Sequence, residues 1–218
     1  MSALDSTLFS HVPQHPALPK PTKIVHIGHS YGSFLSAALL STYGNLSSGA
    51  ILTGFVPNPH ATGLHHTAFN FEHAASSDPS RFSDRPSGYI VPGTPSGVQT
   101  NFFGGDPGIS FTPEMLAYGD KLKQPNTVGE FVSIGMLNLG LAPDFRGPLQ
   151  FVAGDVEYQL CEGDCKGLYD LDMLKAQYAQ AKGVEVHLQP KTGHGLTLHE
   201  NATAGYQVSL SFLARFGL

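Results

Sequence analysis

The sequence predicts an α/β fold with a parallel sheet of about four strands, flanking helices and a long inserted region. Short apolar runs typical of buried strands alternate with helical patterns in residues 23–56 and again in residues 147–218. In the first region a strand, a helix and a second strand follow at the spacing of a βαβ unit, whose strands pair in parallel. Residues able to act in catalysis directly follow three of the predicted strands, so a parallel sheet would bring them to one edge.

Length and charge limit the classes of protein to consider. The chain has 218 residues, enough for one α/β domain with a sizeable core, and a net charge of −5. It has no basic block, which argues against a nucleic-acid partner, and no apolar run near the ~18 residues of a membrane helix. Residues 1–20 lack the apolar segment of a signal peptide, so secretion would require additional chain before them. We expect a globular protein with no membrane span.

The first third of the chain begins with an irregular lead-in and then forms the βαβ unit. Prolines punctuate residues 1–22, which disfavours regular structure there. Residues 23–28 form an apolar run that predicts a buried strand, and residues 31–43 follow with a helical pattern that Gly44 ends. Residues 49–55 are a second apolar run and predict a second buried strand.

Residues 57–146 lose this pattern and are rich in Pro, Gly, Ser, Asn and His. A connection between strands usually has ~2 to 6 residues, so a segment of this length must form a substructure of its own. Helical patterns cover residues 113–122 and 128–139. We expect this region to cap the ends of the strands, its aromatic residues to form its own core, and its histidines to form no metal site. Those histidines are His60, His65, His66 and His73.

The core resumes at residue 147 and completes the sheet. Residues 148–154 predict a third buried strand, and residues 184–188 predict a fourth, shorter strand whose alternating pattern suits an edge. Helical patterns cover residues 168–181 and residues 199–216. The chain is thus divided into a lead-in (1–22), a core (23–56 and 147–218) and an inserted cap (57–146).

The junction between the first strand and its helix carries the motif G-x-S-x-G, from Gly28 to Gly32. A serine hydroxyl is a weak nucleophile, and a sharp strand-to-helix turn presents it where a base can reach it. Gly28 and Gly32 would let the backbones approach closely, and the backbone N–H of Tyr31 would face the charged oxygen of an acyl-transfer transition state. The motif also occurs by chance as a glycine-flanked loop without chemistry. An acid and a histidine in the right order are needed to support the catalytic interpretation of Ser30.

Both residues follow in that order. Asp155 and Glu157 come directly after the third strand, and His194 comes after the fourth strand between two glycines. The order serine, acid, histidine is that of an architecture in which successive parallel strands deliver the three groups to one edge of the sheet. Cys161 and Cys165 are the two cysteines; they form either one local disulfide or two free thiols, and the sequence does not choose between these states.

These motifs resemble the α/β-hydrolase family, most closely its fungal members. The residues that carry the resemblance are Gly28-His29-Ser30-Tyr31-Gly32, the Cys161-x-x-x-Cys165 spacing and the segment Thr192-Gly193-His194-Gly195-Leu196-x-Leu198-His199. The resemblance implies a serine hydrolase without cofactor or metal that cleaves a carboxylic ester or related acyl compound. It places the acid three residues after the glycine that ends the third strand, at Glu157, with Asp155 as the alternative.

Members of that family carry further strands before the serine, whereas 29 residues precede Ser30. The resemblance therefore implies that the strand at residues 23–28 has an unpaired edge through which the chain could associate with itself. It also implies that half of the oxyanion hole has no evident donor. The alternative interpretation of the chain is a truncated, catalytically impaired remnant that binds a small apolar ligand or pairs through this strand.

Overall fold

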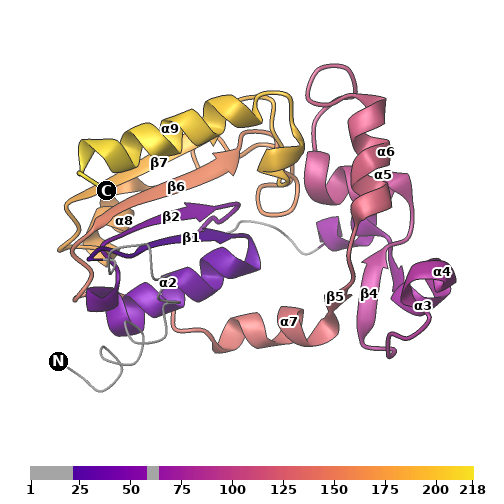
Figure 1. Cartoon of the computed structure of the whole chain (residues 1–218), viewed down its shortest axis with the longest axis horizontal. Coiled ribbons are helices and arrows are strands. Elements are labelled where there is room, and N and C mark those ends of the chain that lie inside the picture. Colours follow the sequence, from indigo (N-terminus) through magenta and orange to yellow (C-terminus); the bar gives the residue numbers. More distant parts are fainter. Residues whose placement is uncertain (1–21, 58–63) are drawn as a thin grey trace, which may run out of the picture.

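The computed structural model describes residues 22–57 and 64–218, and it contains the predicted four-stranded parallel sheet (Figure 1). The predicted lead-in lies almost wholly outside the described residues, as does His60 of the inserted region. The strands are arranged in the order β1-β2-β6-β7, and all neighbours pair in parallel. Their bounds are β1 Val25–His29, β2 Gly49–Thr53, β6 Pro148–Gly154 and β7 Gly183–Gln189. The predicted fold class is confirmed.

Helices cover both faces of this sheet. Figure 1 shows α9 (Ala202–Arg215) on one face and α2 (Tyr31–Tyr43) on the other. Helix α8 (Leu171–Gln177) shares one apolar core with α2, because Leu40 of α2 and Leu174 of α8 belong to the same buried cluster. The strands contribute Leu52 of β2 and Leu149 and Phe151 of β6 to that cluster, and Phe55, which follows β2, belongs to it too.

The predicted elements of the core are present, with shifted ends. Helix α2 begins and ends where the sequence places it, but Gly44 does not end it through a left-handed conformation, since its φ is −58°. A Cβ at Gly44 would instead lie 2.5 Å from the backbone nitrogen of Phe145, so close packing requires the glycine. Strand β7 is an edge strand of the described sheet as predicted, but it is as long as β6. Helix α9 begins at Ala202 rather than at His199, which binds the preceding loop.

The inserted region forms a second, antiparallel sheet with short helices around it (Figure 1). Its strands lie in the order β3-β4-β5, and their bounds are β3 Phe71–His73, β4 Tyr89–Pro92 and β5 Asn126–Thr127. The sequence did not predict these strands, because each has only two to four residues. The α-helices are α3 Ala74–Ser77, α4 Pro79–Phe82, α5 Pro95–Val98, α6 Pro113–Leu122 and α7 Val128–Ser133. Helix α6 has its predicted bounds, whereas α7 ends earlier than predicted and a 3-10 turn, Ile134–Met136, follows it.

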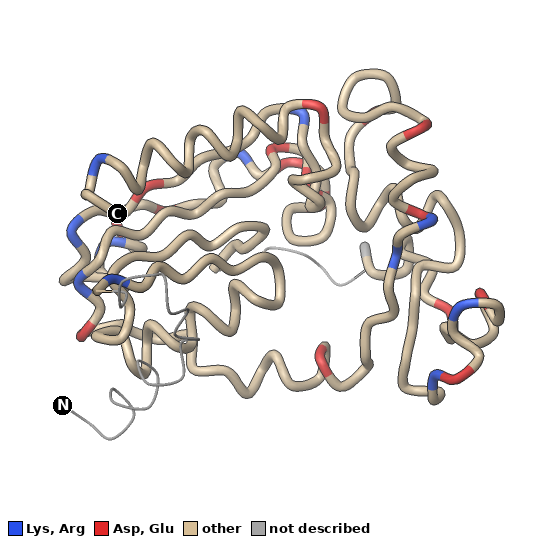
Figure 2. The backbone as a smooth tube through the Cα atoms, in the orientation of Figure 1, with Lys and Arg blue, Asp and Glu red and all other residues tan. Residues whose placement is uncertain are grey.

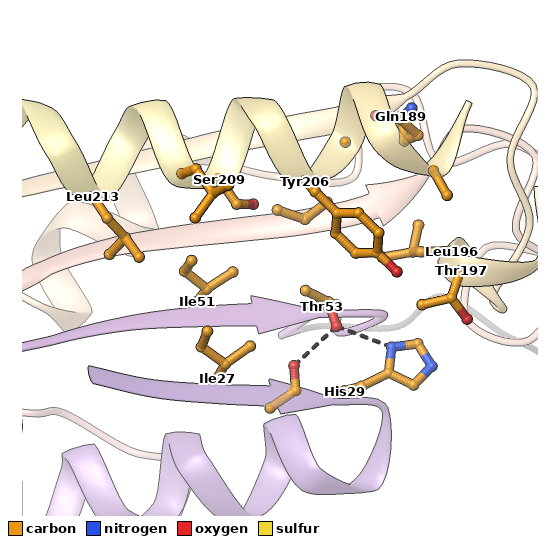
Figure 3. A pocket seen from close by; sticks show the side chains of 15 residues that line it. Ile27, His29, Ile51, Thr53, Gln189, Leu196, Thr197, Tyr206, Ser209 and Leu213 are labelled. Carbon is orange, nitrogen blue, oxygen red and sulfur yellow. Dashed lines mark hydrogen bonds between the residues drawn. The ribbon is translucent and has the colours of Figure 1, made fainter. Parts of the chain in front are cut away.

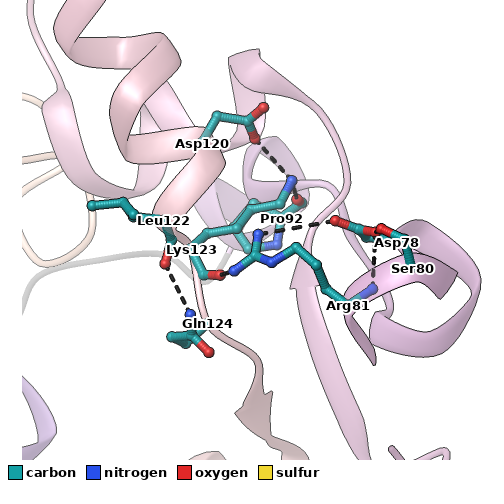
Figure 4. Close-up of polar contacts among 8 residues, drawn as sticks. All are labelled: Asp78, Ser80, Arg81, Pro92, Asp120, Leu122, Lys123 and Gln124. Carbon is teal, nitrogen blue, oxygen red and sulfur yellow. Dashed lines mark hydrogen bonds and ion pairs between the residues drawn. The ribbon is translucent and has the colours of Figure 1, made fainter. Parts of the chain in front are cut away.

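Polar contacts hold the small elements of this region together (Figure 4). The Arg81 guanidinium on α4 donates to the Lys123 carbonyl oxygen at 2.6 Å. The Lys123 ammonium in turn donates to the Pro92 carbonyl oxygen at 2.7 Å and to the Asp120 carboxylate at 2.8 Å. These contacts join α4, the end of α6 and the end of β4, and they add to the buried apolar contact of Phe82 on α4 with Val91 on β4.

Charged residues of both signs are distributed along the chain (Figure 2). Helix α9 carries a single charged side chain, Arg215, at its end. None of the helices in the described ranges is long and apolar enough to cross a membrane.

Candidate active site

Ser30 lies at the turn between β1 and α2 in a conformation that few non-glycine residues adopt. Its φ is 52° and its ψ is −121°. The Ser30 N–H donates to the Thr53 carbonyl oxygen at 2.9 Å, which fixes the turn against the end of β2. Although Ser30 precedes the helix, its hydroxyl does not cap it. Strained backbone of this kind is typical of functional positions, and it leaves the hydroxyl available for another partner.

The two glycines of the motif behave differently. A Cβ at Gly28 would lie 2.6 Å from the Gly32 carbonyl oxygen and 2.7 Å from the Ser33 Cα. Gly28 is therefore required for the close approach of β1 and α2, as expected. A Cβ at Gly32 would meet nothing within 4 Å, so the steric reason expected for this glycine does not hold among the described residues.

His194 and Glu157 form a buried hydrogen-bonded pair. The distance between His194 Nδ1 and Glu157 Oε1 is 2.5 Å, and the two side chains are 2% and 0% exposed. A carboxylate accepts this bond, so Nδ1 carries the proton and Nε2 has a free lone pair. The other acid candidate, Asp155, does not contact His194; its carboxylate accepts from the Thr192 backbone N–H at 3.3 Å.

His199 supports the loop that carries His194. The Gly193 N–H donates to His199 Nε2 at 3.1 Å, and His199 Nδ1 contacts the Gly195 carbonyl oxygen at 3.0 Å. Both neighbours of His194 are thus bound by one side chain. The inserted region holds this loop too, because the Gly195 N–H donates to the Phe102 carbonyl oxygen at 2.6 Å.

A disulfide between Cys161 and Cys165 lies in the segment that directly follows Glu157. Backbone bonds tighten this segment: the Cys165 N–H donates to the Asp155 carbonyl oxygen, and the Gly163 N–H donates to that of Glu157. The Glu157 side chain is thus carried by a compact loop rather than by a strand or helix.

Tyr31 offers a backbone N–H without a backbone partner among the described residues and a phenol that contacts the inserted region. Its backbone N–H is the first of α2 and makes no backbone hydrogen bond within the described chain. Its phenol oxygen lies 2.9 Å from the Ser133 hydroxyl on α7, which joins the start of α2 to the inserted region.

Two residues of this site were not predicted as functional. Thr53, the last residue of β2, accepts two bonds on its carbonyl oxygen, from the Ser30 N–H and from the Ser33 hydroxyl at 2.8 Å. His29 lies beside His194, with a distance of 4.9 Å between ring centroids. Desolvation and the charge of the neighbouring His194 lower the pKa of His29 from 6.5 to about 4. The only sequence signal for these two residues is their position at the ends of strands, beside the strand-to-helix turn at residues 28–32 (the elbow).

An apolar groove of about 580 Å³ lies between the sheet and α9 (Figure 3). Ile27 and Ile51 line it from the strands, Tyr206 and Leu213 line it from the helix, and His29 lies at one end. Ser30 and His194 are not among its lining residues, so His29 is the link between the groove and the Glu157–His194 pair. Within residues 22–57 and 64–218, no cluster of His, Cys, Asp and Glu is arranged to hold a metal ion.

Searches by sequence find no family model and no curated protein that matches the chain. Solved structures are similar to it. The methylesterase protein MES16 from Arabidopsis matches with a TM-score of 0.55 at 15% identity, over 97% of this chain and 75% of that one. Tomato methylketone synthase I, complexed with 2-tridecanone, matches with 0.55 at 17% identity, over 92% and 74% of the two chains. Polyneuridine aldehyde esterase matches with 0.51 at 14% identity, over 91% and 74%. These proteins share the α/β-hydrolase fold, and this chain has that fold.

Proposed function

We propose that the chain is a serine hydrolase that cleaves a carboxylic ester or related acyl compound through Ser30, His194 and Glu157. The observation that carries the proposal is the buried 2.5 Å bond between Glu157 and His194, on loops that follow two neighbouring parallel strands. Ser30 follows a third strand of the same sheet in a strained turn. We assign the acid to Glu157 rather than Asp155, because Glu157 contacts the imidazole.

The chemistry follows from the protonation of each group. His194 Nε2 takes the proton of Ser30 while Oγ attacks the acyl carbonyl, and the imidazolium then gives that proton to the leaving alcohol. Glu157 holds the imidazole in the tautomer with Nδ1 protonated and stabilises the imidazolium charge. Water then attacks the acyl carbonyl while His194 Nε2 takes a proton from it. The imidazolium returns this proton to Ser30 Oγ as the bond between Oγ and the acyl carbon breaks, and the carboxylic acid leaves.

The oxyanion is assigned to the start of α2. The Tyr31 N–H makes no other backbone bond among the described residues, and it belongs to the residue after the nucleophile. One such donor typically contributes about 3 kcal/mol of transition-state stabilisation. We also assign residues 57–146 to a cap, which the Tyr31–Ser133 bond and the bond from Gly195 to Phe102 support.

A fluorophosphonate probe tests this proposal directly, because it reacts only with an activated serine. We expect purified protein to be labelled, and Ser30→Ala and His194→Ala to abolish labelling. Ser36→Ala is the matched control, since the Ser36 hydroxyl donates within α2 to the Gly32 carbonyl oxygen at 2.9 Å and should not affect labelling. Absence of labelling in wild-type protein with a cooperative unfolding transition would refute the proposal.

One observation favours a second candidate function, association through β1 without catalysis. Strand β1 has a partner on one side only in the described sheet, and its Ile27 side chain is 66% exposed. An apolar edge of this kind can pair with another strand. Light scattering of wild-type protein and of Ile27→Lys distinguishes the outcomes: this candidate requires a dimer that the charge disrupts, and a wild-type monomer excludes it.

A further inference from the structure

The hydrogen bonds of Thr53 determine which nitrogen of His29 carries the proton. The Thr53 hydroxyl donates its single proton to the Gly28 carbonyl oxygen at 2.9 Å. The same oxygen lies 2.9 Å from His29 Nδ1, and Figure 3 shows both contacts. Since the hydroxyl has no second proton, it must accept this bond, and Nδ1 must donate. His29 Nε2 is therefore an unprotonated acceptor.

This acceptor has no partner within the described chain. Nδ1 makes the one hydrogen bond of the imidazole, and Nε2 points away from Thr53 at the end of the groove (Figure 3). With a pKa of about 4, the ring is neutral at physiological pH, so the lone pair remains available. The ring lies beside His194, with 4.9 Å between the two centroids, and His29 is next in sequence to Ser30.

We propose that His29 is a substrate-binding residue whose Nε2 accepts a hydrogen bond from a hydroxyl or N–H of the substrate, close to the scissile acyl group. The inference rests on the proposed function and adds a substrate class to it. A neutral acceptor favours hydroxylated esters and related acyl compounds with an N–H. It offers nothing to a carboxylate, which has no proton to donate at neutral pH.

The expected effect is moderate because His29 is exposed to solvent. A hydrogen bond between neutral groups has a net value that corresponds to about a threefold to tenfold preference. We therefore expect kcat/KM for a hydroxylated ester to exceed that of its plain counterpart by about this factor.

Two matched pairs of esters test the preference on each side of the scissile bond. Ethyl 3-hydroxybutanoate against ethyl butanoate places the hydroxyl on the acyl side, and 2-hydroxyethyl butanoate against propyl butanoate places it on the alcohol side. We expect the preference in at least one pair. The first pair exchanges a hydroxyl for a hydrogen, and the second exchanges a hydroxyl for a methyl. Because both esters of a pair are measured with the same preparation, their ratio is insensitive to the concentration of active enzyme.

Three variants test whether His29 is responsible. His29→Phe keeps a flat ring without an acceptor, and Thr53→Val removes the group that fixes the tautomer; both should bring the ratio close to one. His26→Phe is the matched control, because His26 lies on the same strand and contacts the Ser47 hydroxyl at 2.8 Å, away from Ser30. This variant should keep the wild-type ratio.

The outcomes separate the two proposals. Hydrolysis of both members of each pair at equal rates, or a preference that His29→Phe leaves unchanged, overturns the role of His29 but keeps the hydrolase. Loss of the preference in His26→Phe as well would also overturn it, since the effect would then not be specific to His29. Absence of both hydrolysis and fluorophosphonate labelling in the wild type refutes the hydrolase, and this inference with it.

Discussion

The replacement of Gly28 by alanine tests the packing that shapes the elbow. The added Cβ would lie 2.6 Å from the Gly32 carbonyl oxygen, 2.7 Å from the Gly32 carbonyl carbon and 2.7 Å from the Ser33 Cα. Non-bonded carbon atoms normally approach to about 3.5 Å, which is longer than these distances. Strand β1 and helix α2 would therefore have to separate by about 1 Å. All three atoms belong to the backbone, so no side chain can rotate to relieve the overlap. Overpacking typically costs about 1 to 3 kcal/mol, and we expect Gly28→Ala to lie at the upper end.

Gly32→Ala is the matched control, four residues away in the same turn. Its Cβ would meet nothing within 4 Å, and Gly32 lies inside α2, where alanine is favoured over glycine by up to about 1 kcal/mol. The free energy of unfolding should therefore be unchanged or slightly higher than in the wild type. The two glycines look equivalent in the motif, yet their variants should differ by about 3 kcal/mol.

Urea denaturation followed by far-ultraviolet circular dichroism measures this difference, and it suits a chain that has no tryptophan. Fluorophosphonate labelling adds a functional readout, because a shift of ~1 Å at a reacting group lowers rates by about a hundredfold. We expect Gly28→Ala to be both less stable and poorly labelled. Equal stabilities for the two variants, or normal labelling of Gly28→Ala, would contradict the packing argument.

Three further predictions concern the loops and the histidines. Glu157→Gln should lower the rate of fluorophosphonate labelling by about 10³ to 10⁴-fold, because the amide no longer fixes the imidazole tautomer. Asp155→Asn should change this rate less than about tenfold. A larger loss in Asp155→Asn than in Glu157→Gln would assign the acid to Asp155. We expect loss of the Cys161–Cys165 disulfide, by reduction or by replacement of both cysteines with serine, to lower the free energy of unfolding by about 2 kcal/mol, a value typical of so short a loop. An unchanged urea midpoint would contradict a stabilising role of this disulfide. The lowered pKa of His29 means that the unfolded chain binds more protons between pH 6.5 and about 4, so stability should fall across this range as the pH decreases. In His29→Phe the fall in melting temperature between pH 7 and pH 4.5 should be smaller, and an identical fall would show that other groups cause it.

The sheet could be predicted because three of its strands lie in short, mostly apolar runs and the fourth, β7, has an alternating pattern. Residues 148–154 form β6 as predicted, and all seven are buried, which explains why the pattern is so clear. The short strands of the inserted region could not be predicted in the same way. Asn126–Thr127 contains no apolar residue, and it is a strand only because it pairs with Tyr89 and Ile90. Pairing partners that are distant in sequence decide such elements, and a local pattern does not contain them.

The sequence left two candidates for the acid, and the structure shows which of them contacts His194. Asp155 and Glu157 follow the same strand, and position alone left both as candidates. In the structure the chain turns directly after Gly154, so that Asp155 bonds to the Thr192 backbone and Glu157 reaches His194. The turn depends on Gly154 as well, where a Cβ would lie 1.9 Å from the Thr192 carbonyl oxygen. This contact joins two loops and has no signal in either segment alone.

The environment of His29 is the part of the site that the sequence alone could least predict. The register of β1 and β2 pairs His29 with Thr53, and a slip of one residue would turn the hydroxyl to the other face of the sheet. The next residue, Gly54, has a φ of +55° and carries no side chain; a Cβ there would lie 2.9 Å from His194 Cε1 and 3.0 Å from His29 Cε1. The two imidazoles can lie beside each other only because this position is glycine. Thr53 thus determines which nitrogen of His29 is protonated, and Gly54 leaves room for both the His29 and the His194 ring. Neither Thr53 nor Gly54 belongs to a recognised catalytic motif.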